Sequence, residues 1–244
     1  PTALHMPVAL AAAASGSHLF LEKPISHTLD GVEDLRRLVR KKGLTVLTGF
    51  QFRFHPGLRK VKKLLEDGAI GRVVSVQAHW GQYLPGWHPW EDYRNSYAAS
   101  AALGGGGSLT LCHPFDYFRW LIGEVSSVIC QEGRRGGLGI DVEDTADVLL
   151  QFASGATGHV HLNYLERQEE HTLRIVGQSG IISWDNATEN VERNTLYESE
   201  MRHFLSCIAG NEQPLCTLED GIRNLRIVLA AKESAKTGRL VKLV

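Results

Sequence analysis

The strongest constraint on the fold is a change in strand pattern near residue 51. Before it, the segments "HLFLE" (18–22) and "LTVLTGF" (44–50) are apolar, β-favouring runs, each preceded by a helical pattern. Continuous apolar strands that alternate with helices are typical of a parallel sheet covered on both sides. After residue 51, strands alternate apolar and polar positions, which indicates a sheet with one covered face. We therefore expect an α/β part, residues 1–50, followed by an α+β part, residues 51–244.

The predicted elements follow from periodicity and turn signals. In the first part, a helix over residues 2–15 stops at Gly16, and a second helix, capped by Thr28 or Ser26, ends at Gly43. In the second part, strands are predicted over 72–84, 145–153, 157–165, 171–177 and 181–185. Helices are predicted over 55–68, 108–123, 198–210 and 218–238. This pattern predicts one larger antiparallel sheet with helices on one face.

Charge and cysteine content narrow the classes of function. The 26 Lys and Arg residues balance 27 Asp and Glu residues, so no strong field is present to attract nucleic acid or an anionic membrane. The four cysteines contain no C-x-x-C pair, which favours reduced thiols and a cytoplasmic location over a disulfide framework. The alanine-rich start has no basic region before it and is too short to span a bilayer, so we interpret it as a helix rather than a signal peptide.

An ordered set of short motifs runs along the whole chain: "PTALH", "HLFLEKP", "GFQFRFHPGL", "GAIGRVVSV", "GGGG", "CHPFDYFRWL", "RHFLSCIAG" and "SAKTGRLVKL". In this order the motifs resemble the glucose-fructose oxidoreductase and inositol dehydrogenase (Gfo/Idh/MocA) family. The resemblance implies that residues 1–50 are the C-terminal remainder of a Rossmann dinucleotide-binding domain. It implies that residues 51–244 form a substrate domain with a large, mostly antiparallel open sheet. The implied reaction is hydride transfer between NAD or NADP and a hydroxyl carbon of a sugar, cyclitol or nucleotide-linked sugar.

The nucleotide-binding motif of such a domain is absent from the 244 residues. They contain neither a G-x-G-x-x-G loop after a strand nor the acidic residue that would hold the ribose. The "GGGG" at 104–107 does not replace the loop, because no strand leads into it at the needed spacing. In the family's arrangement at least two βαβ units come before this point. We therefore expect the chain as given to bind NAD(H) no tighter than about millimolar and to turn over no substrate.

Two residues are implied in catalysis. By the resemblance, His113 lies against the reacting hydroxyl, and the side chain of Lys23 in "EKP" reaches the same oxygen. The resemblance also implies that the Lys23–Pro24 peptide bond is cis, which would direct the lysine side chain toward this oxygen. Histidine suits a base near neutral pH, and an ammonium group stabilises negative charge on the oxygen. Many members carry an aspartate one turn before this histidine, where this chain has Leu109. Asp116 is the alternative orienting carboxylate, so the division of proton chemistry between His113 and Lys23 stays open.

Further candidates lie around these two. By the resemblance, the residues at the nicotinamide end of the cofactor are Thr2, His5, Glu22, Lys23, Pro24 and Gln51. The candidates for substrate binding are Arg53, Trp87, Tyr93, Arg94, Tyr97 and Asp116. Most of these belong to the aromatic loop at 79–100, and loops of that length are often functional, although a packed loop or a subunit contact is an equal alternative for each. Arg94 is favoured because a guanidinium suits a carboxylate or phosphate.

No metal site is predicted. His159 and His161 lie on one face of a strand, with His79 or His171 as conceivable partners, but spacing places no carboxylate or third ligand beside them. Alternating histidines on a half-exposed sheet are usually surface residues. The pair is therefore interpreted as part of the sheet surface.

The open face of the sheet is expected to meet a second subunit in a dimer or tetramer, because Trp80, Tyr83 and apolar positions on an uncovered face would favour aggregation. Two other functions stay open: an NAD-dependent glycosidase of the same fold, and a non-catalytic sugar-sensing protein. The presence of Lys23 and His113 favours the two enzymatic functions over the sugar-sensing protein. The pattern leaves open which sugar is used, whether NAD or NADP serves, and the direction of reaction.

Overall fold

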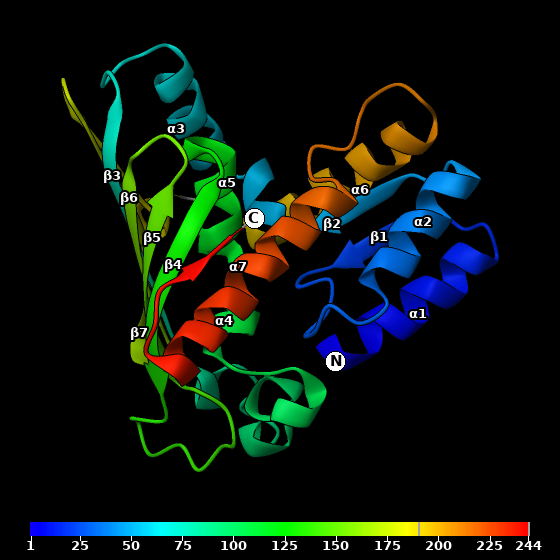
Figure 1. Ribbon diagram of the computed structural model, residues 1–244, viewed down its shortest axis with the longest axis horizontal. Helices are drawn as coiled ribbons and strands as arrows, with labels where there is room; N and C mark the ends of the chain where they lie inside the picture. The colour runs from blue at the N-terminus through cyan, green and yellow to red at the C-terminus, as the bar shows by residue number, and fades with distance from the viewer. Residues whose placement is uncertain (190, 244) are drawn as a thin grey trace.

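A computed structural model describes residues 1–189 and 191–243. Figure 1 shows two layers of structure side by side: a large sheet with helices against one face, and a smaller unit of two strands and two helices. The helices are α1 (Thr2–Ala14), α2 (Val32–Lys42), α3 (Pro56–Glu66), α4 (Gly107–Thr110), α5 (His113–Ile122), α6 (Arg193–Ile208) and α7 (Leu218–Thr237). The strands are β1 (Leu19–Glu22), β2 (Val46–Gly49), β3 (Val73–Tyr83), β4 (Val125–Gly133), β5 (Thr145–Phe152), β6 (Thr157–Asn163), β7 (Leu165–Gly177), β8 (Ile181–Asp185) and β9 (Val241–Lys242).

The smaller unit is parallel, as predicted. β1 and β2 pair in parallel, with Glu22 opposite Gly49 at their carboxyl ends. The predicted cap of α2 is wrong: the helix begins after Gly31, and the Ser26 hydroxyl instead accepts a hydrogen bond from the Thr28 backbone in the preceding turn. The predicted end at Gly43 is confirmed, with a left-handed φ of 61° that favours glycine.

The larger sheet has seven strands in the order β8-β7-β3-β6-β5-β4-β9. Only the β3–β6 pairing is parallel, so the prediction of a mostly antiparallel sheet is confirmed. In Figure 1, α4, α5 and α7 lie against one face of this sheet. The other face is open, which agrees with the alternating burial of the strands. No helix among the described residues is both long and apolar enough to cross a membrane.

Three predictions about this part were wrong. The strand β4 was not predicted, because a bulge between Val125 and Ser127 breaks its alternation. The single helix predicted over 108–123 is two helices, since Pro114 occupies the first turn of α5 and lacks the N–H that a continuous helix would need. Trp80 lies on the covered face, 6% exposed, because it shares the parity of buried Val76 and Ala78.

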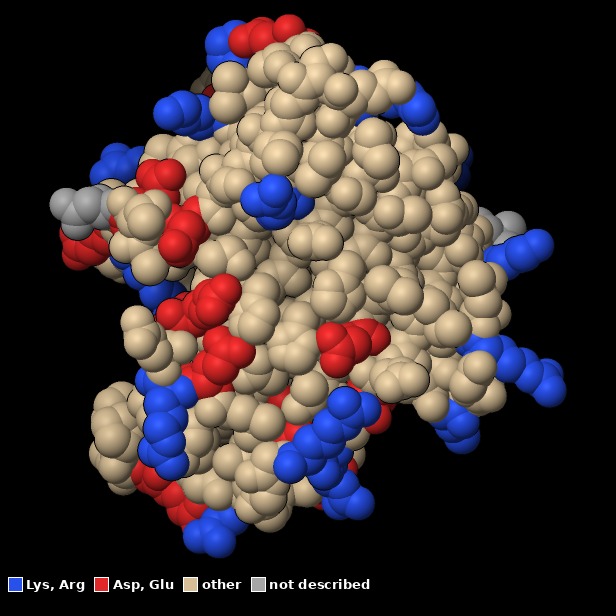
Figure 2. All heavy atoms as spheres, turned by 90° about the vertical axis from the view of Figure 1, so that its left-hand side faces the viewer, with Lys and Arg blue, Asp and Glu red and all other residues tan. Residues whose placement is uncertain are grey.

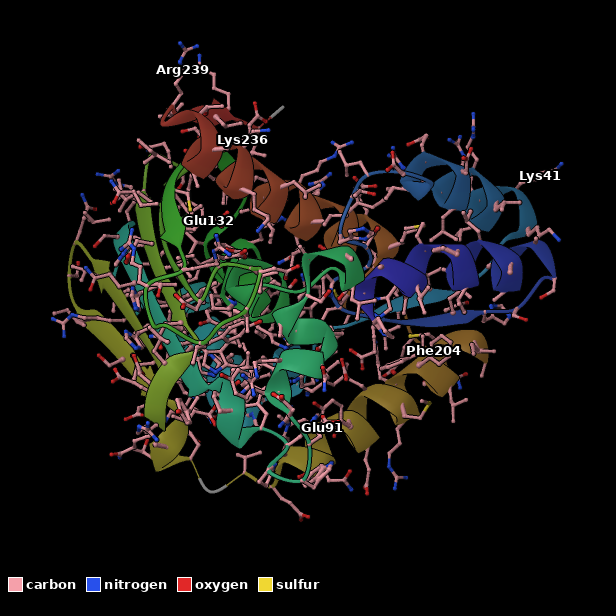
Figure 3. The ribbon with its side chains drawn as sticks, turned by 90° about the horizontal axis from the view of Figure 1, so that it is seen from below. Lys41, Glu91, Glu132, Phe204, Lys236 and Arg239 are labelled. Atoms are coloured by element: carbon pink, nitrogen blue, oxygen red, sulfur yellow. The ribbon has the colours of Figure 1, made fainter. Side chains whose placement is uncertain are left out.

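The last two helices connect the two sheets. Phe204 of α6, labelled in Figure 3, packs against Phe20 of β1 with ring centroids 5.7 Å apart. α7 approaches the smaller sheet closely at Gly221, where a Cβ would lie 2.6 Å from Ile25 and 2.8 Å from Thr48. The same helix packs along β4 of the larger sheet. The turn after β1 is therefore held beside the helices that cover the larger sheet.

Candidate active site

The turn after β1 carries Lys23 toward α4 and α5. Its Lys23–Pro24 peptide bond is cis, as expected. His5 of α1 lies with its Nδ1 atom 2.8 Å from the Pro24 carbonyl oxygen, and the Lys23 ammonium donates to the Thr110 carbonyl at 2.7 Å. Thr110 ends α4, three residues before His113. The side chain of Lys23 therefore lies against the segment that leads into His113.

His113 opens α5 inside an aromatic enclosure. Its ring centroid lies 5.5 Å from Phe50, 4.9 Å from Phe52 and 5.3 Å from Trp80, and the residue is 1% exposed. Its Nδ1 atom is buried and has no hydrogen-bond partner among the described residues. Burial, and next the charge of Lys23, hold the pKa of His113 well below its usual value. The imidazole is therefore neutral, the form that accepts a proton.

The residues expected at the nicotinamide end gather around the carboxyl ends of β1 and β2. Glu22 lies opposite Gly49, where a Cβ would be 3.3 Å from the Glu22 carboxylate. Gln51 follows β2 and is 5% exposed, with its side-chain amide 3.4 Å from the Tyr197 hydroxyl. Ligands of open α/β sheets bind beyond the carboxyl ends of the strands, so the position suits a cofactor.

The glycine stretch at 104–107, called the glycine joint below, packs closely against neighbouring segments of the chain. Gly104 has a φ of 76°, and a Cβ there would lie 2.8 Å from His27 and 2.9 Å from Thr2. Gly106 has a φ of 107° and leaves room for the Glu143 carboxylate, which accepts a hydrogen bond from the Ser108 backbone at 3.1 Å. These glycines let the start of α4 approach α1 and the turn after β1.

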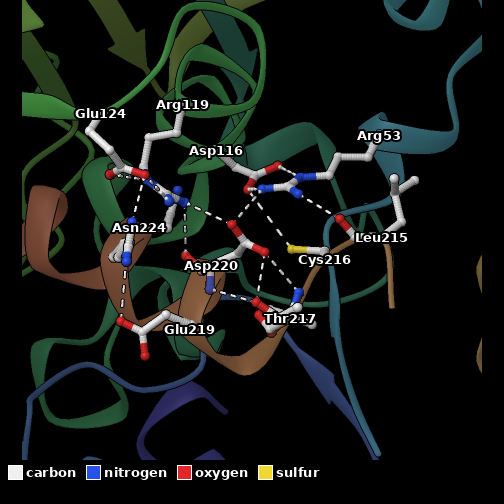
Figure 4. Close-up of polar contacts among 12 residues, drawn as sticks. Arg53, Asp116, Arg119, Glu124, Leu215, Cys216, Thr217, Glu219, Asp220 and Asn224 are labelled. Atoms are coloured by element: carbon white, nitrogen blue, oxygen red, sulfur yellow. Dashed lines mark hydrogen bonds and ion pairs between the residues drawn. The ribbon is translucent and has the colours of Figure 1, made fainter. Parts of the chain in front are cut away.

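Arg53 and Asp116 pair with each other in the interior of the protein. Two hydrogen bonds of 2.9 and 2.7 Å join the guanidinium to both carboxylate oxygens, and the residues are 4% and 1% exposed. Figure 4 shows how the pair continues through Asp220 to Arg119. The sequence-based expectation that Asp116 orients His113 or meets substrate differs from this arrangement, because a buried carboxylate binds preferentially to a buried guanidinium.

Three candidates on the aromatic loop, Trp87, Tyr93 and Arg94, are held by contacts within the loop or with neighbouring segments. The Tyr93 hydroxyl donates to the Leu138 carbonyl at 2.7 Å, and Trp87 packs edge-on against Tyr164. Arg94 is exposed and donates to Asp92, a neighbour on the same turn. Tyr97 is the member nearest the glycine joint, since a Cβ on Gly105 would lie 2.3 Å from its carbonyl oxygen.

Sequence reasoning missed a buried carboxyl group, Glu200 of α6. It is 0% exposed, and neither carboxyl oxygen has a hydrogen-bond partner among the described residues. Burial, with a further contribution from the charges of Glu22 and Asp116, raises its pKa to about 8. A signal was present: Glu200 interrupts the buried stripe of α6, between Leu196 and Phe204.

A pocket of about 520 Å³ lies away from Lys23 and His113, under the C-terminal end of α7. Figure 3 labels two of its residues, Glu132 and Lys236. Inside it, the Lys232 ammonium lies 2.8 Å from Glu143 and 3.5 Å from Glu132. These contacts hold the glycine joint against β4, which is a structural role.

Comparison with known proteins follows the same division of the chain. Residues 58–183 match the family model described as the GFO/IDH/MocA C-terminal domain. The chain belongs to the Gfo/Idh/MocA family. Residues 1–50 match the model for the NAD-binding Rossmann fold of this oxidoreductase family, and residues 191–243 match its C-terminal alpha/beta domain.

Relatives in the Gfo/Idh/MocA family act on sugars and cyclitols by name. Levoglucosan dehydrogenase of Pseudarthrobacter phenanthrenivorans is 31% identical over 88% of this chain, which spans 61% of that protein's length. Myo-inositol 2-dehydrogenase of Thermotoga maritima is 28% identical over 99% of this chain, which spans 77% of it. A levoglucosan dehydrogenase structure in complex with NADH has the same fold, with a TM-score of 0.90 at 23% identity, covering 100% of this chain and 78% of that one.

Proposed function

We propose that this protein is an NAD(P)-dependent dehydrogenase that moves a hydride between the nicotinamide and a hydroxyl carbon of a sugar or cyclitol. The observation that carries the proposal is the convergence of Lys23 and His113: the Lys23 ammonium bonds the carbonyl three residues before His113, and its charge contributes to the low pKa of that imidazole. Relatives named for levoglucosan and myo-inositol support the class of substrate. In this proposal residues 1–50 serve the cofactor and residues 51–244 serve the substrate.

The proposed roles follow from protonation states. The neutral His113 takes the proton of the substrate hydroxyl, and the Lys23 ammonium stabilises the negative charge that develops on the same oxygen. Both oxygens of Asp116 bond Arg53, and Leu109 fills the position one turn earlier, so neither residue offers His113 a carboxylate. Burial and the positive charge of Lys23 both disfavour the protonated form of His113. We therefore propose that Lys23 also takes part in transferring the hydroxyl proton.

The residues near β1 and β2 fit the nicotinamide end of the cofactor. Glu22, Pro24 and Gln51 lie at or just beyond the carboxyl ends of two parallel strands, His5 contacts the Pro24 carbonyl, and Thr2 packs against Gly104. When bound, the nicotinamide accepts or donates the hydride. On the substrate side we favour Tyr97, beside the glycine joint, over Trp87, Tyr93 and Arg94 of the outer loop. Arg53 and Asp116 are then positioning residues, because they anchor α5 from within.

We also propose a homo-oligomer formed through the open sheet face. Figure 2 shows uncharged residues over much of this face, with acidic and basic groups among them. Three apolar side chains stand on it, Ile129, Leu149 and Ile181, exposed by 40%, 56% and 52%. Exposed apolar residues in the middle of a sheet face favour association. Four buried free cysteines support a reducing compartment such as the cytoplasm as the location.

The experiment is to incubate the full-length protein with NAD⁺ or NADP⁺ and a panel of levoglucosan, myo-inositol and monosaccharides, and to follow reduced cofactor by absorbance. We expect net reduction with at least one polyol. Lys23→Met and His113→Ala should each lower kcat by about 10²- to 10⁴-fold, and Lys60→Met, at an exposed position of α3, should leave it unchanged.

Three results would oppose the proposal or a part of it. Cleavage of a glycoside without net release of reduced cofactor would identify an NAD-dependent glycosidase instead. Activity that survives in Lys23→Met and His113→Ala at the level of Lys60→Met would remove these residues from the chemistry. A large loss of melting temperature in His113→Ala would indicate that this histidine serves the core.

A further inference from the structure

Three potential metal ligands meet on the open face of the larger sheet. His79 of β3 lies opposite His161 of β6 in the parallel pairing, and their rings stack with centroids 4.9 Å apart. Glu166, at the start of β7, completes the group: one ligand atom from each residue lies within 4.8 Å of the others. The three side chains are 26–31% exposed, so an ion from solvent reaches them.

The carboxylate of Glu166 is held in place by two features of the neighbouring strands. At Gly81, two residues after His79, a Cβ would lie 2.1 Å from the Glu166 carboxyl group, so only glycine lets the carboxylate lie across β3. Asn163, opposite Gly81, donates to the Glu166 carboxylate at 2.7 Å and accepts from the Glu166 backbone at 3.1 Å. These two features of the sheet therefore hold the Glu166 carboxylate 2.6 Å from Nε2 of His79.

A second carboxylate orients the other imidazole. Asp147 of β5 lies 2.7 Å from Nδ1 of His161, which assigns the proton to Nδ1 and leaves the lone pair on Nε2. The Nε2 atom faces the same group and accepts a hydrogen bond from the Asn163 side-chain amide at 3.2 Å, a contact that a bound metal ion would replace. A histidine that binds a metal through one nitrogen usually donates from the other to a carboxylate, and Asp147 provides that contact.

A second cluster of three potential metal ligands lacks these properties. His203, Cys207 and Glu212 also bring their ligand atoms within 4.8 Å. However, Nε2 of His203 accepts a hydrogen bond from the Leu215 backbone at 2.9 Å, and Nδ1 lies 2.8 Å from Glu212. The Nε2 atom is occupied by a backbone amide, which cannot rotate away from a metal ion as the Asn163 side chain can beside His161, so this cluster is not a candidate.

We propose that His79, His161 and Glu166 form a binding site for Zn²⁺, with a fourth position open to water or to an external ligand. Two imidazoles and one carboxylate are a common zinc donor set, whereas Mg²⁺ and Ca²⁺ prefer all-oxygen sites. A hollow of about 500 Å³, lined by His79, His159 and His161, leaves space for the fourth ligand. The site is on the open sheet face and the inference does not rest on the proposed reaction; in the proposed oligomer the fourth position faces the subunit interface.

The test is calorimetric titration of ZnCl₂ into EDTA-treated full-length protein. We expect saturation at one ion per chain with a dissociation constant in the micromolar range or tighter, and no comparable heat from Mg²⁺. His79→Ala and Glu166→Gln should each weaken Zn²⁺ binding by at least about tenfold, and Asp147→Asn by a similar factor through His161. His88→Ala is the control, because it removes an exposed histidine whose hydrogen bond is to Glu91 and not to a residue of the proposed site.

The visible spectrum of the wild-type protein with Co²⁺ is a second readout that needs no variant. A tetrahedral Co²⁺ spectrum that Zn²⁺ abolishes supports the site. A spectrum equal to that of aqueous Co²⁺ overturns the proposal. So does Zn²⁺ affinity that is unchanged in His79→Ala and Glu166→Gln, or that His88→Ala lowers by as much as they do.

Discussion

The buried carboxyl of Glu200 predicts an unusual dependence of stability on pH. Its pKa in the folded protein is about 8, against 4.5 for an unperturbed glutamate, because it is buried near other acidic groups. The folded state therefore keeps a proton that the unfolded state releases above about pH 4.5. The stability that this group contributes is fully present below that pH and is lost as the pH rises toward about 8.

The magnitude follows from the shift. Each pKa unit corresponds to about 1.4 kcal/mol, so a displacement from 4.5 to about 8 lowers the free energy of unfolding by roughly 5 kcal/mol between these limits. Glu200→Gln keeps the shape of the side chain and removes the titration. The free energy of unfolding of the variant minus that of the wild type should therefore increase by about 1.4 kcal/mol per pH unit across the window.

The assay is urea denaturation of both proteins at several pH values between about 5 and 8, followed by tryptophan fluorescence. Glu198→Gln is the control, because it makes the same change of side chain at an exposed position of the same helix. A difference for Glu200→Gln that is constant with pH, or that decreases as the pH rises, would refute the reasoning.

Three other perturbations test separate parts of the structure. Asp116→Ala should destabilise the protein by about 3–5 kcal/mol in chemical denaturation, because it leaves the Arg53 guanidinium buried without its main partner, while Arg53→Met combined with it should recover part of the loss. Lys23→Gln should move the acidic limb of the kcat/KM profile to higher pH, because the lysine charge contributes to the low pKa of His113; an unmoved limb would contradict that coupling. Leu149→Glu, on the open sheet face, should shift the protein toward monomer in sedimentation velocity, and an unchanged assembly would exclude this face as the interface.

The predictable and unpredictable parts of the fold have different physical origins. Local signals such as Gly43 and the apolar run of β1 act within a few residues, so they could be read from the sequence. The strand β4 could not, because its bulge breaks the period on which the reading depends. Trp80 was assigned to the wrong face because the parity of a long strand is set by which side the helices cover.

Prediction of the candidate site is limited in the same way, because several of its contacts join residues that are far apart in the sequence. Lys23 and His113 were predicted through motifs whose order is characteristic of the family, and their surroundings agree with that prediction, although their roles stay a proposal. The pairing of Arg53 with Asp116 joins residues 63 positions apart, and no local pattern indicates it. Glu166 reaches His79 only because Gly81 leaves the space, and that contact arises from strand register.

The most direct test of the central claim is a double-mutant cycle on hydride transfer in the full-length protein. Steady-state rates of cofactor reduction would be measured for wild type, Lys23→Met, His113→Ala and the double variant, with the polyol that the substrate panel identifies. Residues that act on one oxygen as a unit show strongly non-additive effects. We expect the double variant to lose about as much kcat as the more damaged single variant. Losses that multiply would contradict a shared site for Lys23 and His113.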